Sequence, residues 1–284
     1  MPFANLEGIR IRYEVIGSGP PLLMLAPGGF DATISRWRLN GVWKDLQPLE
    51  TLTREFRLIA YDRREIGESG GRIEPLTWEV YAREAVALLD HLAIDQALLM
   101  GGCMGCAVAL AVGARFPNRC RALLMHFPVG GYRWMHKGLS AFNDHIAFTR
   151  QHGLAATVER AKKTQSFWRG EPEGGPWSGV IASDPAFAQS FVRQDLTRYL
   201  EIVAQSRDNL FSDTMPSGAT GEQLMAMKIP AFIMPGDDPA HSYSSAQALR
   251  EIMPQVTLSP LMPPQQNAAT VGEWIRDSVA AARH

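Results

Sequence analysis

Short, continuously apolar segments alternate along this chain with segments that have the apolar spacing of a helix. The run "PLLMLAP" (residues 21–27) ends at a glycine pair, and "FRLIAYD" (residues 56–62) ends at a polar loop. Residues 78–91 then follow with helical spacing. Continuous apolar runs of this length are typical of strands buried on both faces. Their alternation with helices predicts an α/β fold with a mostly parallel sheet flanked by helices.

The same alternation continues through the rest of the chain, apart from one long interruption. The sequence predicts further strands at residues 9–17, 96–102, 119–128, 229–238 and 255–261, and further helices at residues 103–116, 244–253 and 272–282. Residues 130–227 have helical patterns and no strand pattern. We therefore predict a core domain formed by residues 1–129 and 228–284 and a helical cap formed by residues 130–227. We expect this cap to set substrate specificity.

The charge balance argues against several classes of partner. The chain has 284 residues, with 28 Lys and Arg against 29 Asp and Glu, and a formal net charge of −1. It has no basic cluster that would follow a phosphate backbone, so no nucleic-acid partner is expected. Because it has no apolar run of about 18 residues and no secretory signal pattern, we expect no membrane association and a cytoplasmic location. The oligomeric state stays open, with a homodimer among the alternatives.

A cysteine stands at the sharpest predicted turn. In "GGCMG" (residues 101–105), Cys103 has a glycine two positions to either side, after a predicted strand and before a predicted helix. This spacing is typical of a nucleophile elbow, where the corner residue has a strained backbone and the glycines avoid side-chain clashes. The N-terminus of the following helix favours a thiolate. We therefore predict that Cys103 is a nucleophile, the alternative being a small buried residue.

The other two cysteines are predicted to be packing residues. Cys106 completes a C-x-x-C pair with Cys103, and Cys120 lies at the start of a predicted strand. A single pair does not make a structural zinc site, and redox-active pairs of this spacing occur in a different setting. We therefore expect neither a metal nor a cofactor.

With this elbow the chain resembles the α/β-hydrolase fold family, in which most members have serine where this chain has Cys103. Residues 13–29 resemble the first hairpin and the oxyanion loop of that family, and residues 229–238 resemble the strand whose end supplies the acid. Residues 58–71 resemble a further segment, in which Glu65 replaces an expected glycine. The resemblance implies an oxyanion hole. Its backbone N–H groups would come from Met104, Gly28, Gly29 and Phe30.

The resemblance also implies an acid and then a histidine after the nucleophile. Asp237 and Asp238 are alternatives for the acid. The histidine expected after residues 255–261 is absent, because the chain there has "MPPQQNAATV". No histidine occurs between His241 and His284. This absence is the main departure from the family pattern.

Two other histidines are candidates for the base. His241 lies three residues after Asp238, in the loop expected to hold the acid, and is slightly preferred. His126 ends a predicted strand, at the sheet edge where ligands bind in open α/β sheets. Structural roles are the alternatives: a surface position for His241, a satisfied core position for His126, and a helix cap near Ser242 for Asp238.

Several further residues are expected to have structural roles. Arg63 and Arg64 are predicted to be ion-paired or solvated, and a position lining the pocket is the alternative. The sequence leaves open whether three tryptophans pack the cap or face an apolar ligand, namely Trp134, Trp168 and Trp177. Four histidines are expected at the surface: His91, His136, His145 and His152.

Three hypotheses for function follow. The leading one is a hydrolase in which Cys103 attacks a small, largely apolar ester, thioester or lactone, with a small molecule as its only expected partner. The second is a cofactor-independent lyase or C–C bond-cleaving enzyme. The absence of the histidine expected after residues 255–261 is consistent with a reaction other than ester hydrolysis. The third is a member that binds a small molecule without catalysis, since fold alone does not settle function.

Overall fold

The computed structural model describes residues 2–168, 171–212 and 216–282; Met1, the terminal His284 and the residues in the gaps lie outside this description. A single eight-stranded sheet forms the centre, with the strand order β1-β2-β4-β3-β5-β6-β7-β8. Its strands are β1 (Phe3–Leu6), β2 (Ile9–Ile16), β3 (Pro21–Leu25), β4 (Arg57–Tyr61), β5 (Ala97–Gly102), β6 (Cys120–His126), β7 (Ala231–Met234) and β8 (Val256–Leu258). β2 runs antiparallel to β1 and β4, and the remaining pairs are parallel. The predicted α/β fold with a mostly parallel sheet is confirmed.

The continuous apolar runs form strands because both of their faces are covered. All six residues of β5 are buried, and Leu99 pairs in register with Leu23 of β3 and Leu123 of β6. One hydrophobic core lies on each side of the sheet. Burying both faces of a strand removes the polar alternation that a half-exposed strand would show.

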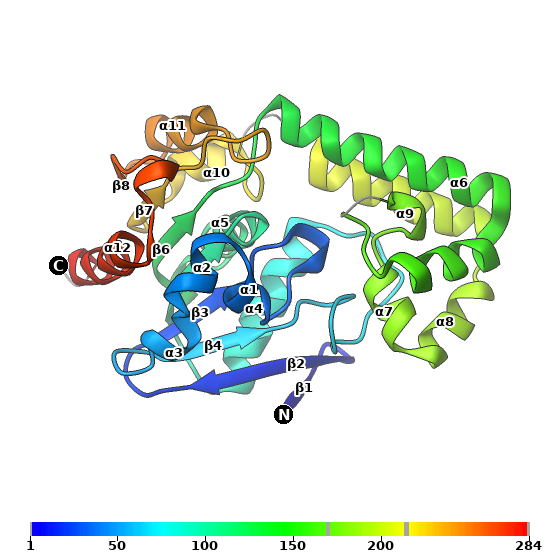
Figure 1. Ribbon diagram of the computed structural model, residues 1–284, viewed down its shortest axis with the longest axis horizontal. Helices are drawn as coiled ribbons and strands as arrows, with labels where there is room; N and C mark the ends of the chain where they lie inside the picture. The colour runs from blue at the N-terminus through cyan, green and yellow to red at the C-terminus, as the bar shows by residue number, and fades with distance from the viewer. Residues whose placement is uncertain (1, 169–170, 213–215, 283–284) are drawn as a thin grey trace.

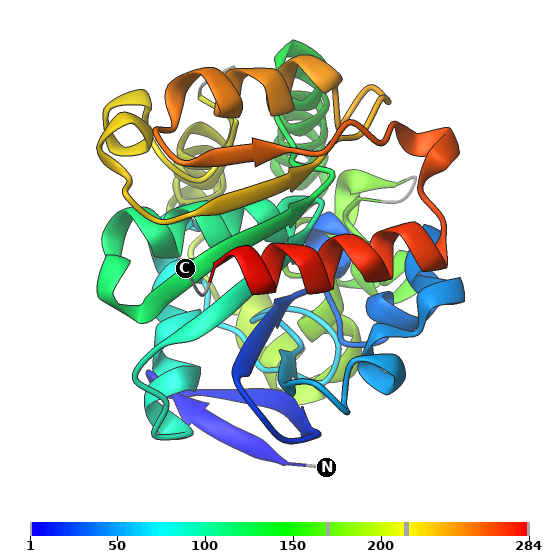
Figure 2. The same cartoon turned by 90° about the vertical axis from the view of Figure 1, so that its left-hand side faces the viewer.

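Helices cover both faces of the sheet. They are α1 (Arg36–Leu39), α2 (Gly41–Leu46), α3 (Pro48–Thr51), α4 (Trp78–His91), α5 (Met104–Arg115), α10 (Gly221–Ala226), α11 (Tyr243–Ile252) and α12 (Ala268–Ala281). Residues of α4, α5, α10 and α11 belong to one core, and residues of α1, α2, α3 and α12 belong to the other. Figure 2 shows α12 lying across its face of the sheet.

A long helical insertion separates β6 from β7. It contains α6 (Tyr132–Thr164), α7 (Ser178–Ser183), α8 (Pro185–Val192) and α9 (Leu196–Phe211), which lie together at the right of Figure 1. α6 is broken at Gly153, whose φ of 77° is the left-handed conformation that glycine tolerates. In the part of the insertion that the structure describes, no strand is present, as predicted. The described helices are all too short or too polar to traverse a lipid bilayer.

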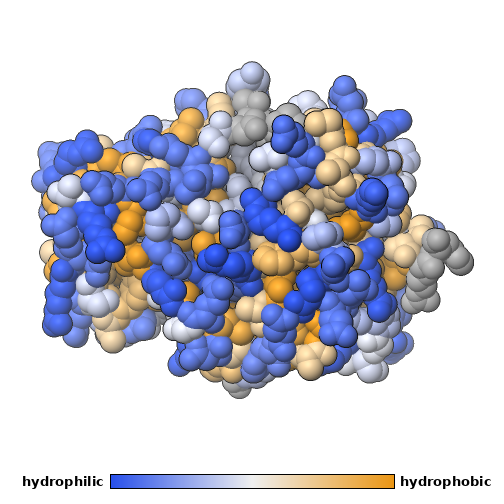
Figure 3. All heavy atoms as spheres, turned by 180° about the vertical axis from the view of Figure 1, so that it is seen from behind, coloured by the Kyte–Doolittle hydropathy of each residue, from blue (hydrophilic) through white to orange (hydrophobic). Residues whose placement is uncertain are grey.

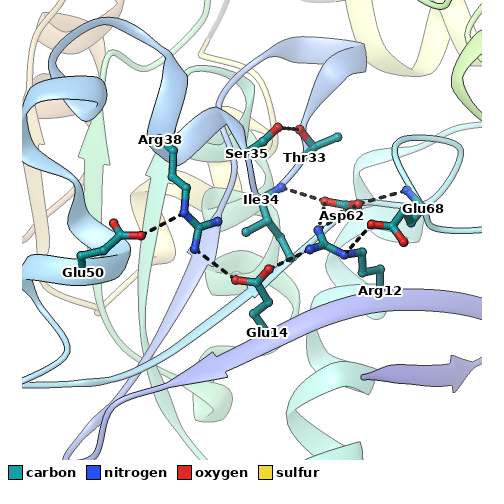
Figure 4. A network of polar contacts seen from close by, with 9 residues as sticks. All are labelled: Arg12, Glu14, Thr33, Ile34, Ser35, Arg38, Glu50, Asp62 and Glu68. Atoms are coloured by element: carbon teal, nitrogen blue, oxygen red, sulfur yellow. Dashed lines mark hydrogen bonds and ion pairs between the residues drawn. The ribbon is translucent and has the colours of Figure 1, made fainter. Parts of the chain in front are cut away.

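A network of charged side chains holds the segment after β3 against β4 (Figure 4). Asp62, next after β4, accepts hydrogen bonds from the backbone N–H groups of Ile34 at 2.8 Å and Glu68 at 3.1 Å. Arg12 of β2 contacts the same carboxylate at 3.4 Å. Arg38 of α1 joins the network by contacting Glu14 at 3.3 Å. These bonds fix α1 and the loop before it, which border the site described below.

The surface seen in Figure 3 is mainly hydrophilic, with hydrophobic residues scattered in small areas. Large hydrophobic side chains are exposed at Leu39, Tyr132, Val192 and Met225. Scattered apolar residues are normal for a monomer surface.

Candidate active site

Cys103 occupies a strained corner between β5 and α5. Its backbone angles are φ 53° and ψ −123°, a conformation that side chains rarely adopt. A Cβ atom at Gly105 would overlap the carbonyl oxygen of Leu25, and one at Gly101 would come within 2.5 Å of the Gly105 oxygen. The close approach of β3, β5 and α5 therefore requires glycine at both positions. This is the geometry of the elbow that the glycine spacing predicted.

The elbow glycines give a prediction about stability. Gly105→Ala is expected to lower the free energy of unfolding by about 2–3 kcal/mol, because the new methyl group must displace the backbone of β3 or α5. Urea unfolding followed by circular dichroism measures this. Gly221→Ala is the matched control, since a Cβ at Gly221 meets no atom within 4 Å. Equal midpoints for the two variants would contradict the close approach at the elbow.

His241 and Asp238 lie in the loop after β7. Nδ1 of His241 lies 2.7 Å from Oδ2 of Asp238. The other carboxylate oxygen of Asp238 accepts hydrogen bonds from the backbone N–H groups of Ala240 at 2.8 Å and His241 at 3.1 Å. The carboxylate is thus fixed within its own loop and orients the imidazole, and it makes no cap to the helix that begins after Ser242. The Asp238 side chain is 48% exposed and that of His241 only 16%.

The free nitrogen of His241 faces the cysteine. Burial by itself raises the pKa of the Cys103 thiol, but the interaction with His241 and the backbone N–H groups of Gly28 and Met104 outweigh this and lower it. Burial likewise lowers the pKa of His241, but Cys103 and Asp238 together raise it to about 9. Nε2 of His241 is buried and makes no well-aligned hydrogen bond to a described residue. Contacts of this loose geometry are common in sites without substrate. Both shifts favour the thiolate–imidazolium form of the pair over its neutral form.

The loop after β3 reaches the same sulfur. The backbone N–H groups of Gly28 and Met104 interact with Cys103 and lower its pKa. Both residues belong to the predicted oxyanion hole. Gly29, at the start of a 3-10 turn, has its carbonyl oxygen held by the Arg63 guanidinium at 2.8 Å. The side chain of Phe30 is buried and points into an aromatic cluster with the insertion.

A cavity of about 320 Å³ opens beside the cysteine. It is lined by Pro27, Gly28, Asn40, Gly41, Val42, Trp43, Cys103, His126, Phe127, His241, Pro263 and Gln266. None of these lining residues belongs to the described part of residues 130–227. Residues 40–43, where α1 is followed by α2, form one wall of this cavity.

A larger cavity of about 520 Å³ lies on the exposed side of the Asp238 loop and does not include Cys103. Asp237 lines this cavity together with Asp238. Among the described residues, the smaller cavity is the one lined by both Cys103 and His241. Of the two acid candidates, Asp238 contacts the site histidine.

His126 also lines the smaller cavity, at the end of β6. Burial lowers the pKa of His126 to about 3, so its imidazole is neutral at physiological pH. Its Nε2 lies 3.2 Å from the side-chain oxygen of Gln266. Gln266 belongs to the segment where a histidine was expected, and sequence reasoning did not identify it as a site residue. The signal that could have identified Gln266 was its position after β8, in the segment where the family pattern has a histidine.

The remaining candidates have structural environments. Cys106 and Cys120 are buried, and the Cys106 sulfur contacts the carbonyl oxygens of Gly101 and His126. Arg64 is buried in ion pairs with Glu84 and Glu74, both at 2.7 Å. Within residues 2–168, 171–212 and 216–282, no group of three His, Cys, Asp or Glu side chains is arranged to hold a metal ion.

The insertion has an aromatic interior. Trp134 and Trp177 are buried, and the Trp168 ring packs against Trp134 and Phe211. A Cβ at Gly29 would come within 3.1 Å of the Trp168 ring, so the aromatic side chains of the insertion pack closely against the loop after β3. Trp134 and Trp177 thus pack inside the insertion, and the half-buried Trp168 packs between it and the loop after β3.

The burial of one histidine in the insertion differs from the prediction. His145 was expected at the surface but is fully buried. It lies 2.7 Å from the hydroxyl group of Tyr199 and 2.8 Å from the carbonyl oxygen of Glu173. Because both ring nitrogens have partners, the cost of burying the imidazole is offset. Burial lowers the pKa of His145 to about 4, which keeps it neutral.

A family model of the alpha/beta hydrolase fold matches residues 21–167, just over half of the chain. The chain belongs to the α/β hydrolase fold family. The matched part includes Cys103 and ends before Asp238 and His241.

Known proteins of this fold resemble the chain at low identity. The 2-hydroxymuconate semialdehyde hydrolase of Pseudomonas sp. strain CF600 is 32% identical over 136 residues, which are 47% of this chain and 45% of that protein. The chain thus matches less than half the length of the first curated relatives. A thermophilic esterase from Thermogutta terrifontis has 20% identity and a TM-score of 0.62, with 98% of each chain covered. The enol-lactonase from Burkholderia xenovorans LB400 has 19% identity and a TM-score of 0.60, with 99% of this chain and 98% of that one covered. At these identities the structures show a shared fold.

Proposed function

We propose that this protein is a hydrolase in which Cys103 is the nucleophile for a small, largely apolar ester, thioester or lactone. One observation carries the proposal: Cys103 stands at a strained elbow beside His241, whose other ring nitrogen contacts Asp238 at 2.7 Å. A nucleophile, a base and a group that orients the base are the parts that covalent acyl transfer needs. Asp238 is the preferred acid over Asp237, and His241 the preferred base over His126.

In the first half of the reaction, the Cys103 thiolate attacks the carbonyl carbon. The C=O π electrons move to oxygen, and the backbone N–H groups of Gly28 and Met104 stabilise this oxyanion. The intermediate then collapses, the bond to the leaving group breaks, and that group takes the proton from Nε2 of His241. The products are a thioester on Cys103, the free alcohol or thiol, and a neutral imidazole.

In the second half, the neutral His241 takes a proton from water as the water oxygen attacks the thioester carbonyl. A second oxyanion forms in the same place and collapses, and the sulfur leaves as a thiolate. The carboxylic acid is released, and the imidazolium–thiolate pair is restored. Asp238 keeps the imidazole oriented and favours its charged form throughout.

The cavity supports a small substrate. A volume of about 320 Å³ lies at the lower end of the range for ligand pockets. Val42, Trp43, Phe127 and the proline rings make its walls largely apolar. An esterase and an enol-lactonase among the proteins of similar fold support acyl substrates. In the same proposal, residues 130–227 form a cap on a core of residues 1–129 and 228–284, and the enzyme works in the cytoplasm.

Selective alkylation tests the proposal directly. Iodoacetamide is expected to label Cys103 at a lower pH than an ordinary thiol with a pKa of about 8.5, because the lowered pKa of Cys103 favours its thiolate. Burial raises the pKa of Cys106 well above its usual value, so that thiol is expected to stay unlabelled. Mass spectrometry of peptides locates the label, and loss of ester hydrolysis should follow its stoichiometry.

Full labelling of Cys103 with no loss of activity would overturn the cysteine-nucleophile proposal. Turnover in water labelled with oxygen-18 separates the alternatives. One labelled oxygen in the acid product supports hydrolysis, and an unlabelled product supports a lyase. Binding of small esters without any thiol adduct or turnover supports a non-catalytic member.

A further inference from the structure

The ring of His126 is held rigidly in the wall of the Cys103 cavity. The residue is only 4% exposed. Its ring stacks on Phe127 with centroids 4.2 Å apart and meets Trp43 edge-on at 4.6 Å. Its backbone carbonyl accepts a hydrogen bond from the N–H of Cys103 at 3.0 Å. The imidazole therefore keeps one orientation next to the elbow.

The hydrogen bonds of Gln266 determine where the His126 proton lies. The side-chain nitrogen of Gln266 donates to two backbone carbonyl oxygens, those of Pro235 and Leu261, both at 2.8 Å. Because both partners can only accept, the amide cannot be reversed, and its oxygen faces His126. That oxygen can only accept, so Nε2 of His126 must donate to it across the 3.2 Å contact. The proton of the neutral ring is on Nε2, and Nδ1 has a free lone pair.

Nδ1 of His126 has no protein partner. Its ring makes one hydrogen bond with the described residues, the one from Nε2. Nδ1 is not among the fully enclosed side-chain atoms without partners, so it is not completely covered by protein, and the residue borders the cavity. The ring stays neutral because burial lowers its pKa to about 3. A fixed, neutral acceptor thus borders a largely apolar pocket.

We propose that Nδ1 of His126 accepts a hydrogen bond from the substrate, so that the site selects acyl compounds with a hydroxyl group close to the reacting carbonyl. This inference rests on the proposed acyl hydrolysis and names its substrate class. Gln266 is a positioning residue, because it fixes the tautomer that leaves Nδ1 as an acceptor. A substrate without the hydroxyl group would leave this acceptor unpaired in an apolar pocket, which disfavours it.

Matched esters test the selection. The kcat/KM for p-nitrophenyl 2-hydroxybutyrate or 3-hydroxybutyrate is expected to exceed that for p-nitrophenyl butyrate by about tenfold or more. His126→Phe keeps a flat ring without an acceptor and should bring this ratio to about one. His126→Asn places an amide oxygen near the position of Nδ1 and should restore part of the ratio. A wild-type ratio near one for both hydroxy esters overturns the proposal.

A readout independent of turnover tests the role of Gln266. Nitrogen-15 NMR of the histidine rings is expected to show His126 as the Nε2–H tautomer from pH 5 to 9. Gln266→Leu removes the acceptor and should give a mixture of tautomers, with a loss of hydroxy-ester preference. Gln266→Glu keeps an acceptor and should keep the Nε2 proton. An unchanged tautomer in Gln266→Leu overturns the positioning role.

The two proposals fail in different ways. If Cys103→Ala retains esterase activity, the nucleophile proposal fails while the hydroxyl preference can still be measured. If the wild-type protein hydrolyses no ester, the Kd values of 3-hydroxybutyrate and butyrate are compared by quenching of tryptophan fluorescence, since Trp43 lines the cavity. Tighter binding of the hydroxy acid, lost in His126→Phe, then supports the acceptor role. Equal Kd values overturn it.

Discussion

Cys103→Ala is expected to lower kcat/KM for ester hydrolysis by about 10,000-fold or more. The variant keeps the cavity and the backbone donors of Gly28 and Met104, so only the oxyanion contribution and binding remain. The substitution removes one sulfur atom from a partly buried position and should leave the fold intact. Steady-state kinetics with p-nitrophenyl butyrate and a hydroxy ester measures the loss.

Two comparison variants sharpen this experiment. Cys120→Ala removes a buried thiol at the start of β6, away from the cavity, and should keep the activity of the wild-type protein. Cys103→Ser is expected to lose most activity as well. A serine hydroxyl stays protonated, so His241 loses the negative partner that raises its pKa. Residual activity above about one-tenth in Cys103→Ala would assign the chemistry to another group.

The central sheet was predictable from the sequence for a simple physical reason. Because β3, β4 and β5 are buried on both faces, each appears in the sequence as a short apolar run, and the turn residues at the ends of these runs distinguish them from a longer buried helix such as α5. The short elements β1 and α1 to α3 were not predicted, because their sequences show neither a clear apolar run nor a helical period. β1 has four residues, and α1 to α3 have four to six each, too few for a period to appear.

The elbow and its partners differ in how far the sequence determines them. Cys103 was recognisable because a local backbone strain demands glycines at fixed spacing. Asp238 and His241 contact each other three residues apart, so their loop could be proposed from the sequence. The wall at residues 40–43 and the amide of Gln266 could not, since they approach the cysteine only through the packing of α2 and α12 on one face of the sheet. The burial of His145 likewise depends on Tyr199, which is remote in sequence.

His241→Gln is expected to lower kcat by about 1,000- to 10,000-fold. Glutamine keeps a polar group of similar length but can neither protonate the leaving group nor take a proton from water. His136→Gln is the matched control, because His136 is exposed on α6, and it should leave kcat unchanged. Equal losses in the two variants, or full activity in His241→Gln, would exclude His241 as the base.

The pH dependence gives this variant a second readout. The reactive form has a thiolate at Cys103 and a proton on His241. It is lost as the pH rises through about 9, where His241 loses its proton, and it is lost at acid pH, where Cys103 gains one below its lowered pKa. The wild-type rate should therefore fall at alkaline pH above about 9 and also at acid pH. In His241→Gln the thiol loses its positive neighbour, so alkylation of Cys103 should require a pH nearer that of an ordinary thiol. An alkylation profile unchanged by the substitution would show that another group lowers the pKa of Cys103, and the candidates are then the backbone donors of Gly28 and Met104.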